Sequence, residues 1–307
     1  MPTGIPTNRT NIALPTDIAQ EIIAKTVEES AIMRLARRIN LPGRGVTIPM
    51  ITADPEAAWV AETNPKPASN PSLSSKIMQG YTLAVIVPFS KQFLRDARSL
   101  YDELIRRLPA ALGTKFDKTV IGAADAPGEN FDRLVNCTTQ SLVPDTNHSS
   151  YDALVAADTD IAVNGGLLNG FALSPQARGI LLNAVDSTGR PLFVNNVAEG
   201  AIPMILGART LMNRGLYKAG AAPVGTDAGT PAIVGIAGDW TKAMWGAVGE
   251  VAIDVTDQAT ITVGSGTDAQ EINLWQRNMV AVRAEIEVGF RCDTSVFNLL
   301  AGEIPTT

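Results

Sequence analysis

The stretch from residue 90 to residue 122, SKQFLRDARSLYDELIRRLPAALGTKFDKTVIG, constrains the fold more than any other segment. Its larger apolar residues recur every three or four positions, which predicts a helix that buries one stripe. They are Phe93, Leu94, Leu100, Leu104, Leu108, Leu112, Phe116 and Val120. The other side is charged, includes Arg106 and Arg107, and is expected to face water or a neighbouring chain. If the whole stretch is helical, it is roughly 50 Å long.

Two residues interrupt this helical pattern. Ser99 can act as an N-cap with Asp102 in the first turn, which would divide the stretch into a short and a longer helix. Pro109 removes one backbone hydrogen bond and presses on the carbonyl of Ile105. We therefore expect a bend in the longer helix.

Composition limits the class of protein. With 307 residues, of which 45% are hydrophobic and 18% charged, the chain can build one large or two ordinary domains. Twenty-five basic against 31 acidic residues give a net charge of −6, which argues against a dedicated nucleic-acid reader but allows local contact with DNA. Cys137 and Cys292 are in no metal or redox spacing. No apolar run is long enough to cross a bilayer, and the start lacks a signal-peptide pattern, so we expect no membrane attachment.

The segment before residue 53 contains an arm and a helix. Residues 1–15 are rich in Thr, Pro and Asn and are expected to form an extended arm that needs a partner surface. A helix is predicted from its N-cap at Thr16 to an end near Arg37 and Arg38, whose charges suit a helix C-terminus. Residues 46–50 alternate as a short strand, which Pro49 marks as an edge or irregular strand.

Residues 53–88 predict a long hairpin. A short apolar start at residues 57–62 is followed by TNPKPASNPSLSSK and then by a strand from Tyr81 to Val87. Such a hairpin cannot bury its polar outer half within its own domain. A long loop in an otherwise compact chain is usually functional, so we predict that it lies across another subunit.

The segment after the long helix has mixed α and β character. Residues 123–150 are rich in turn-forming residues, which suggests a crossing into a second domain. A helix from Ser150, a buried strand at residues 171–173 and a helix with Ser174 as N-cap and Pro175 at its first position follow. Residues 202–207 and 232–237 are apolar runs that predict central strands.

The last section shows mainly strand patterns. Apolar and polar residues alternate over residues 251–255, 261–263 and 280–288, which predicts an antiparallel sheet. A one-sided sheet and a helical stripe are each unstable until they are packed together, so residues 240–300 should fold back onto residues 90–122. Residues 136–239 then form an insertion between them.

This order of segments resembles the major capsid proteins of tailed phages of the Hong Kong 97 (HK97-like) type. The similar segments, in order, are LPTDIAQEIIAKTVEESAIMRLA, VTIPM, AAWVAET, VIVPFSKQFLRDA, FALSPQARGILLNAVDSTGRPLF, IPMILGARTLM, AIVGIAGDW and MVAVRAEIEVGFRCDTSVFNLL. Each is a loose pattern alone, but their order over nearly the whole chain is specific.

The resemblance implies an α+β, HK97-like capsid fold. It assigns an N-terminal arm (1–52), an extended loop (53–88), a peripheral domain in which the spine helix packs on the antiparallel sheet (89–135 and 240–307), and an α/β axial domain (136–239). Members of the family assemble as hexamers and pentamers into an icosahedral shell around double-stranded DNA. We therefore expect a structural protein of the virion, assembled in the host cytoplasm, and no enzyme.

The resemblance also implies partners. Besides other copies of the chain, these are a portal protein, a decoration or cement protein, and packaged double-stranded DNA held by non-specific contacts. Because the arm begins almost directly after Met1, we expect a separate scaffolding protein or none, and no proteolytic maturation. The residues expected at assembly contacts are Trp59, Glu62, Lys66, Lys76, Arg106 and Arg107.

No catalytic, cofactor-binding or metal-binding site is expected. His148 is the only histidine and lies in a polar loop, and both thiols are expected to be shielded. The pairs Asp254/Asp257 and Glu285/Glu287 fit the polar face of a sheet, and Trp59, Trp240, Trp245 and Trp275 fit packing anchors, with Trp59 also placed to press on a neighbour.

Some members of the family join a loop lysine to an asparagine of an adjacent subunit. The residues available for such a bond here are Lys66, Lys76, Asn278 and Asn298. We expect no cross-link, because neither asparagine aligns with the family's site.

Two alternatives differ in function. An encapsulin-like nanocompartment shell of the same fold would hold enzyme cargo in place of DNA. A soluble α/β enzyme would require a convergent polar cluster that the sequence does not show.

Overall fold

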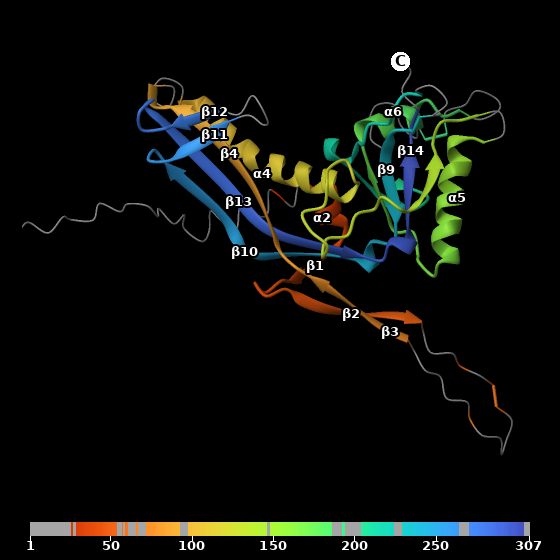
Figure 1. Cartoon of the computed structure of the whole chain (residues 1–307). Coiled ribbons are helices and arrows are strands. Elements are labelled where there is room, and N and C mark those ends of the chain that lie inside the picture. Colours follow the sequence, from red (N-terminus) through yellow and green to blue (C-terminus); the bar gives the residue numbers. More distant parts are fainter. Residues whose placement is uncertain are drawn as a thin grey trace, which may run out of the picture.

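The computed structural model describes residues 26, 29–53, 57, 59, 60, 66, 72–92, 98–145, 148–185, 192, 193, 204–223, 229–263 and 270–303. These residues form two sheets side by side, a long helix that lies along one of them, and a hairpin that projects from the body (Figure 1).

The larger strands build a four-stranded sheet. Its members, in spatial order, are β1 (Arg37–Asn40), β10 (Ala243–Thr256), β13 (Met279–Cys292) and β4 (Tyr81–Ser90). β10, β13 and β4 are antiparallel, whereas β1 runs parallel to β10. Burial alternates along β4 and the middle of β13, as the sequence pattern predicts. A bulge interrupts β10 between Val248 and Ala252.

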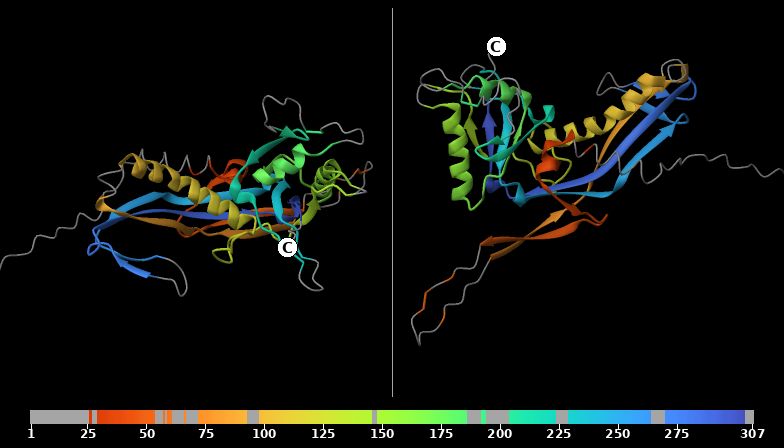
Figure 2. Two further views of the ribbon diagram at one scale, coloured as in Figure 1. Left: turned by 90° about the horizontal axis from the view of Figure 1, so that it is seen from above. Right: turned by 180° about the vertical axis from the view of Figure 1, so that it is seen from behind.

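The long helix covers one face of this sheet. Helix α4 (Arg98–Val120) packs Phe116 against Phe290 of β13, with ring centroids 5.9 Å apart, so the predicted packing of helix on sheet is confirmed. Figure 2 shows α4 along the sheet in both further views. Pro109 lies inside the helix. Ser99 is the second residue of the described helix, so the prediction that it is the N-cap is wrong.

A six-stranded sheet forms the second half of the body. Its members, in spatial order, are β5 (Thr138–Ser141), β14 (Phe297–Ala301), β9 (Ile233–Gly238), β6 (Gly170–Leu173), β8 (Ala208–Met212) and β7 (Met204–Ile205). β6, β9 and β14 are buried at every position, which is typical of central strands.

Two predictions about this sheet fail. In the predicted run 202–207, the described residues 204–207 do not form a central strand, because β7 has only two residues and lies at the edge of the sheet. Leu206 and Gly207 have φ of 48° and 77°, so the rest of the described run is a tight turn into β8. The closing strand β14, expected with residues 240–307 in the peripheral domain, pairs instead with β9 and β5.

Two helices with the predicted starts pack against the second sheet. Helix α5 (Ser150–Val163) begins with a capping box between Ser149 and Asp152. Helix α6 (Pro175–Leu182) has Ser174 as N-cap and Pro175 at its first position, as predicted.

Two short 3₁₀ turns join the sheets. η2 (Trp240–Lys242) connects β9 to β10, and η4 (Thr294–Val296) connects β13 to β14. Asp239 and Asp293 cap them by accepting from the backbone N–H groups of Thr241 and Ser295. The Trp240 ring packs edge-on against Phe297 with centroids 5.1 Å apart, so the junction is filled by aromatic side chains.

The segment before β1 differs from the predicted helix. The described helix α2 (Ala31–Leu35) ends at Leu35, and Arg37 and Arg38 begin β1. Arg38 places its guanidinium 5.4 Å from the centroid of the Trp245 ring. Pairing with β10 has therefore overridden the helical pattern at the two arginines. The predicted arm, residues 1–15, and the N-cap at Thr16 lie outside the described residues.

The two strands of the projecting hairpin differ from the predicted ones. β2 (Val46–Ala53) pairs with β3 (Ser72–Met78), whereas the strand at residues 81–87, expected as the returning arm, belongs to β4. Pro49 lies in β2, a strand with a single partner, as its predicted edge position requires. β11 (Thr260–Val263) and β12 (Gln270–Asn273) form a small antiparallel ribbon that follows β10 in the chain. The 3₁₀ turn η1 (Arg214–Leu216) follows β8.

Candidate assembly interface

The hairpin of β2 and β3 leaves the body on the side of the four-stranded sheet opposite α4 (Figures 1 and 2). A small apolar cluster of Leu41, Ile48, Met78 and Met244 fixes its base on the sheet. Met78 is fully buried. Because Ile48 pairs with Lys76 and successive residues of a strand face opposite ways, Ile77 lies on the outward face, where it is 52% exposed.

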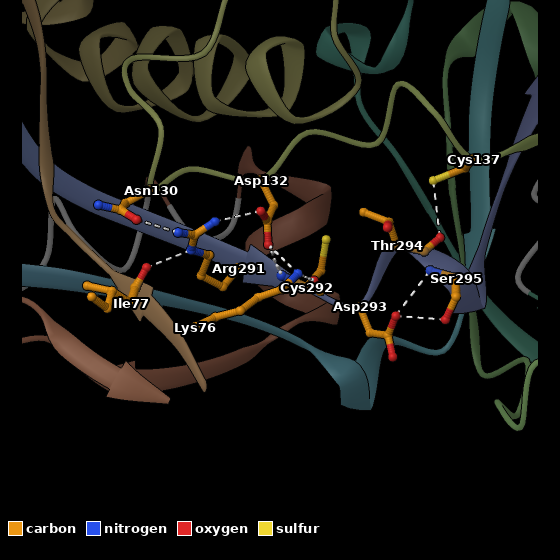
Figure 3. A network of polar contacts seen from close by, with 10 residues as sticks. All are labelled: Lys76, Ile77, Asn130, Asp132, Cys137, Arg291, Cys292, Asp293, Thr294 and Ser295. Carbon is orange, nitrogen blue, oxygen red and sulfur yellow. Dashed lines mark hydrogen bonds and ion pairs between the residues drawn. The ribbon is translucent and has the colours of Figure 1, made fainter. Parts of the chain in front are cut away.

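A polar network holds β3 to the body beside this cluster (Figure 3). Arg291 is 8% exposed and donates three hydrogen bonds: to the Ile77 carbonyl (2.7 Å), to Asp132 (2.7 Å) and to Asn130 (2.6 Å). Lys76 donates from the opposite side to Asp132 (3.1 Å) and to the Cys292 carbonyl (2.7 Å).

Asp132 is the shared acceptor of this network. Its two oxygens accept from Arg291, Lys76 and the Cys292 N–H, the last at 3.0 Å. Two cations on one carboxylate in a half-buried site fix the direction of β3 more strictly than apolar contact alone, because charged hydrogen bonds are directional. The network therefore sets the angle at which the hairpin leaves the sheet.

The sequence predicted a functional role for Lys76 but none for Arg291 or Asp132. A signal was present for Arg291, because it follows a strongly apolar run at the end of β13, where an arginine needs a buried partner. Asp132 lies in the turn-rich segment and carries no local signal.

The predicted contact residues lie in several different places. Trp59 is fully exposed and Lys66 is exposed, both in the segment beyond the β2–β3 ribbon. Lys76 is committed to its own chain, and Arg107 is exposed on α4. Glu62 and the side chain of Arg106 lie outside the described residues. The structure thus does not gather these residues at one point.

Two of the four cross-link candidates are engaged within the chain. Asn298 is 2% exposed and donates to the Ala157 carbonyl at 3.1 Å, and Lys76 is held by Asp132. A lysine of another subunit could reach the Asn298 amide only if β14 opened.

A second buried network joins α4 to two distant segments. The carboxylate of Asp117 is inaccessible to solvent and accepts from Ser30 Oγ (2.6 Å), the Ala31 N–H (3.0 Å), the Ile32 N–H (3.4 Å) and Asn213 Nδ2 (2.7 Å). Burial raises the pKa of Asp117 to about 7, because loss of hydration outweighs the four donors. We call these residues the Asp117 junction.

Glycines make the close approach at this junction possible. A Cβ on Gly113 would lie 2.9 Å from the Thr26 carbonyl oxygen, and one on Gly215 would lie 2.6 Å from the Thr114 carbonyl oxygen. The backbones on both sides of α4 therefore touch it directly.

Both cysteine thiols lie in environments that disfavour the thiolate. Burial raises the pKa of the Cys137 thiol to about 12, and burial followed by the charge of Asp132 raises the pKa of the Cys292 thiol well above its usual value. Both are poor nucleophiles. No group of three His, Cys, Asp or Glu among these residues is placed to hold a metal ion. His148 lies in an exposed loop, as predicted.

The tryptophans and the paired carboxylates are partly as predicted. Trp240 and Trp245 are buried, whereas Trp275 is 66% exposed in the turn before β13 and Trp59 is fully exposed, so neither is a packing anchor within the described chain. Asp254 and Glu285 bind Arg283 on the exposed face of the sheet, which confirms their assignment to its polar face. No described helix is both long and apolar enough to cross a membrane.

A long helix on an antiparallel sheet, a second sheet joined to it by two turns, and a projecting hairpin are together the architecture of the HK97-like capsid fold. A chain from Gordonia phage Cozz superposes with a TM-score of 0.69 at 21% identity, covering 90% of this chain and 87% of that one. A chain from Mycobacterium phage Ogopogo gives a TM-score of 0.70 at 18% identity, covering 89% and 92%. The predicted fold class is confirmed.

The sequence gives the same family. The model of the Phage capsid family matches residues 10–293. The "Probable major capsid protein gp17" of Mycobacterium phage L5 is 31% identical over 285 residues, which cover 90% of this chain and 84% of that protein. The chain belongs to the phage capsid family, and its function is that of a tailed-phage major capsid protein, a component of the virion. This confirms the predicted function, and the encapsulin-like alternative is not favoured.

Proposed function

We propose that the chain assembles as hexamers and pentamers into an icosahedral shell that encloses double-stranded DNA. One observation carries this proposal: a two-stranded ribbon leaves the body at an angle set by the Arg291 network, with apolar Ile77 on its outward face. A two-stranded ribbon is marginal in water by itself. It is expected where a neighbouring copy covers it, and many modest contacts then add up through symmetry.

The division into domains follows from this proposal. The arm (1–52) and the extended loop (53–88) reach neighbouring copies, the peripheral domain (89–135 and 240–307) forms the flat part of the shell, and the axial domain (136–239) points to the local symmetry axes. The closing strand β14 belongs structurally to the axial sheet, so the axial domain would include it.

The proposed partners follow the same reasoning. They are other copies of the chain, a portal protein, a separate scaffolding protein, a decoration or cement protein, and non-specifically held double-stranded DNA. Assembly takes place in the host cytoplasm and the chain has no enzymatic activity. Trp59, Glu62, Lys66, Arg106 and Arg107 contact neighbouring copies, and Lys76 acts by holding the hairpin at its base.

The test is assembly of the recombinant full chain. Size-exclusion chromatography and electron microscopy should show capsomers and closed particles for the wild type. Replacing residues 54–71 with a short Gly-Ser turn should leave soluble, folded subunits that form no shell. Closed particles from that variant, or a wild type that stays monomeric, would contradict the proposal.

A further inference from the structure

Two neighbouring cavities on this acidic chain are lined by basic side chains. The first has a volume of about 510 Å³ and is lined by Arg34 of α2, Arg37 of β1 and Arg209 of β8. We call it the arginine cavity. The second, of about 630 Å³, is lined by Lys115 and Lys118 of α4 and by Arg214 of η1, and we call it the lysine cavity. All six side chains are exposed.

The two cavities lie on neighbouring stretches of the same two segments. Each is lined by residues of the α2 region and of the β8–η1 region. Asn213 and Glu29 both line the lysine cavity, and the Asn213 amide donates a hydrogen bond to the Glu29 carbonyl. The view from behind shows α2 beside the C-terminal part of α4 (Figure 2, right), where Asp117 of α4 accepts from Ser30 and from Asn213. We call the surface that carries both cavities the basic band.

These six cations have no acidic partner among the described residues. Other basic side chains of the chain do form ion pairs: Lys91 with Asp257, Arg283 with Asp254 and Arg291 with Asp132. Among the residues that the structure describes, Glu29 is the single acidic residue that lines the lysine cavity, and no acidic residue lines the arginine cavity.

A buried acid next to the arginine cavity, Asp239, is engaged by hydrogen-bond donors and forms no ion pair with the arginines. Asp239 is 5% exposed, and its oxygens accept from the Leu167 N–H (3.2 Å), from Asn169 Nδ2 (2.9 Å), and from the Thr241 N–H (3.0 Å) and hydroxyl (2.6 Å). Asn169 and Thr241, which line the cavity, are thereby occupied, and the arginines are the groups left to meet a ligand.

We propose that this band binds the phosphodiester backbone of packaged double-stranded DNA. Cations in two neighbouring cavities suit a ligand whose negative charge repeats, and duplex DNA carries one charge per about 3.4 Å along each strand. Arginine forks and lysine ammonium groups both bind phosphate, and neither needs a particular base. This inference rests on the proposed function, because it names the surface through which the shell would hold its DNA.

The charge distribution supports phosphate over an acidic protein segment. A lone carboxylate would meet one cavity only, whereas phosphate charges recur along the whole backbone. The chain as a whole carries a net charge of −6, so DNA would be repelled from most of its surface and attracted to this band.

The test compares three double variants with equal charge change in the full-length chain. Arg34→Gln/Arg209→Gln removes two cations from the arginine cavity, and Lys115→Gln/Lys118→Gln removes two from the lysine cavity. Arg44→Gln/Arg277→Gln is the matched control, because both its arginines are exposed and line neither cavity. Fluorescence anisotropy with a labelled 30-base-pair duplex, measured from 50 to 200 mM NaCl, gives affinity and its salt dependence.

Each cavity variant should bind the duplex at least about tenfold more weakly. Its slope of log affinity against log salt should be less negative by about 1.8, while the control keeps the wild-type slope. Wild-type binding by both cavity variants would overturn the proposal. An equal loss in the control would also overturn it, because net charge alone would then explain binding.

Particle formation separates this inference from the proposed function. Electron microscopy of the same preparations should show closed particles for all three variants. If the cavity variants keep their DNA affinity but no longer form particles, the band binds an acidic protein partner and the DNA proposal is overturned. If the wild type itself forms no particles, the proposed function fails, whatever the anisotropy shows.

Discussion

Replacing Asp117 tests the buried junction between α4, α2 and the segment after β8. In Asp117→Ala, the hydroxyl of Ser30, the N–H groups of Ala31 and Ile32, and the Asn213 amide lose their acceptor in a place without solvent. An unsatisfied buried donor costs about 1–3 kcal/mol, and part of the loss is recovered because a buried carboxylate no longer has to be desolvated. We expect a net loss of about 3 kcal/mol in the free energy of unfolding.

The pH dependence gives a sharper test. The pKa of Asp117 is about 7 in the folded chain, whereas its ordinary value is 3.8. Between these pH values the folded state keeps a proton that the unfolded state releases, so this group's contribution to stability is present below pH 3.8 and is lost as the pH rises through 7. At about 1.36 kcal/mol per pH unit, the whole change is about 4 kcal/mol.

Asp117→Asn removes this titration while keeping one acceptor oxygen. The free energy of unfolding of the wild type minus that of Asp117→Asn should fall by about 4 kcal/mol between pH 4 and pH 8. Denaturation of unassembled subunits, followed by tryptophan fluorescence, measures it. Trp245 is a suitable reporter, because its indole N–H donates to the Met33 carbonyl of α2 at 3.0 Å.

The control for this experiment is Asp125→Asn, which changes a fully exposed carboxylate. An equal fall in this control would show that the effect does not come from the Asp117 junction. A flat or rising difference for Asp117→Asn would show that the carboxylate is ionised across this range and that its four donors outweigh its burial.

Three further predictions concern the other networks. Arg291→Ala should cost about 3 kcal/mol and speed amide hydrogen exchange in residues 72–78, with partial recovery in Arg291→Lys; unchanged exchange would mean that the apolar cluster alone holds the hairpin. Cys292 should stay unmodified by a thiol reagent at pH 8 until the chain is unfolded, because burial raises its pKa, and rapid labelling of the native protein would contradict this. Trp245→Phe should lower the denaturation midpoint, whereas Trp275→Phe should leave it unchanged, and an equal effect would contradict the difference in burial between the two rings.

Local patterns predicted much of the fold. The apolar stripe of α4, the caps of α5 and α6, and the alternation along β4 and β13 are properties of neighbouring residues, and each element formed where the pattern placed it. The packing of helix on sheet followed because both have a single apolar face. The order of these segments was also sufficient to indicate the capsid family.

Local sequence patterns did not predict the polar networks that hold the hairpin and the long helix. Lys76 was named as a contact residue because it lies in the loop segment, but its role depends on Asp132 and Arg291, which are distant in sequence. Asp117 carries no signal of its own, since an acidic residue in an amphipathic helix normally lies on the solvated side.

The sequence by itself determined the identity of the long helix, most of the strands and the family of the protein, because periodicity and capping act over a few residues. Only the tertiary structure decided that β3 pairs with β2 while β4 joins the main sheet, that β14 closes the second sheet, and which charged groups are buried. The physical reason is that strand partners and buried ion networks are selected by contacts between distant segments, whose free energy no local pattern records.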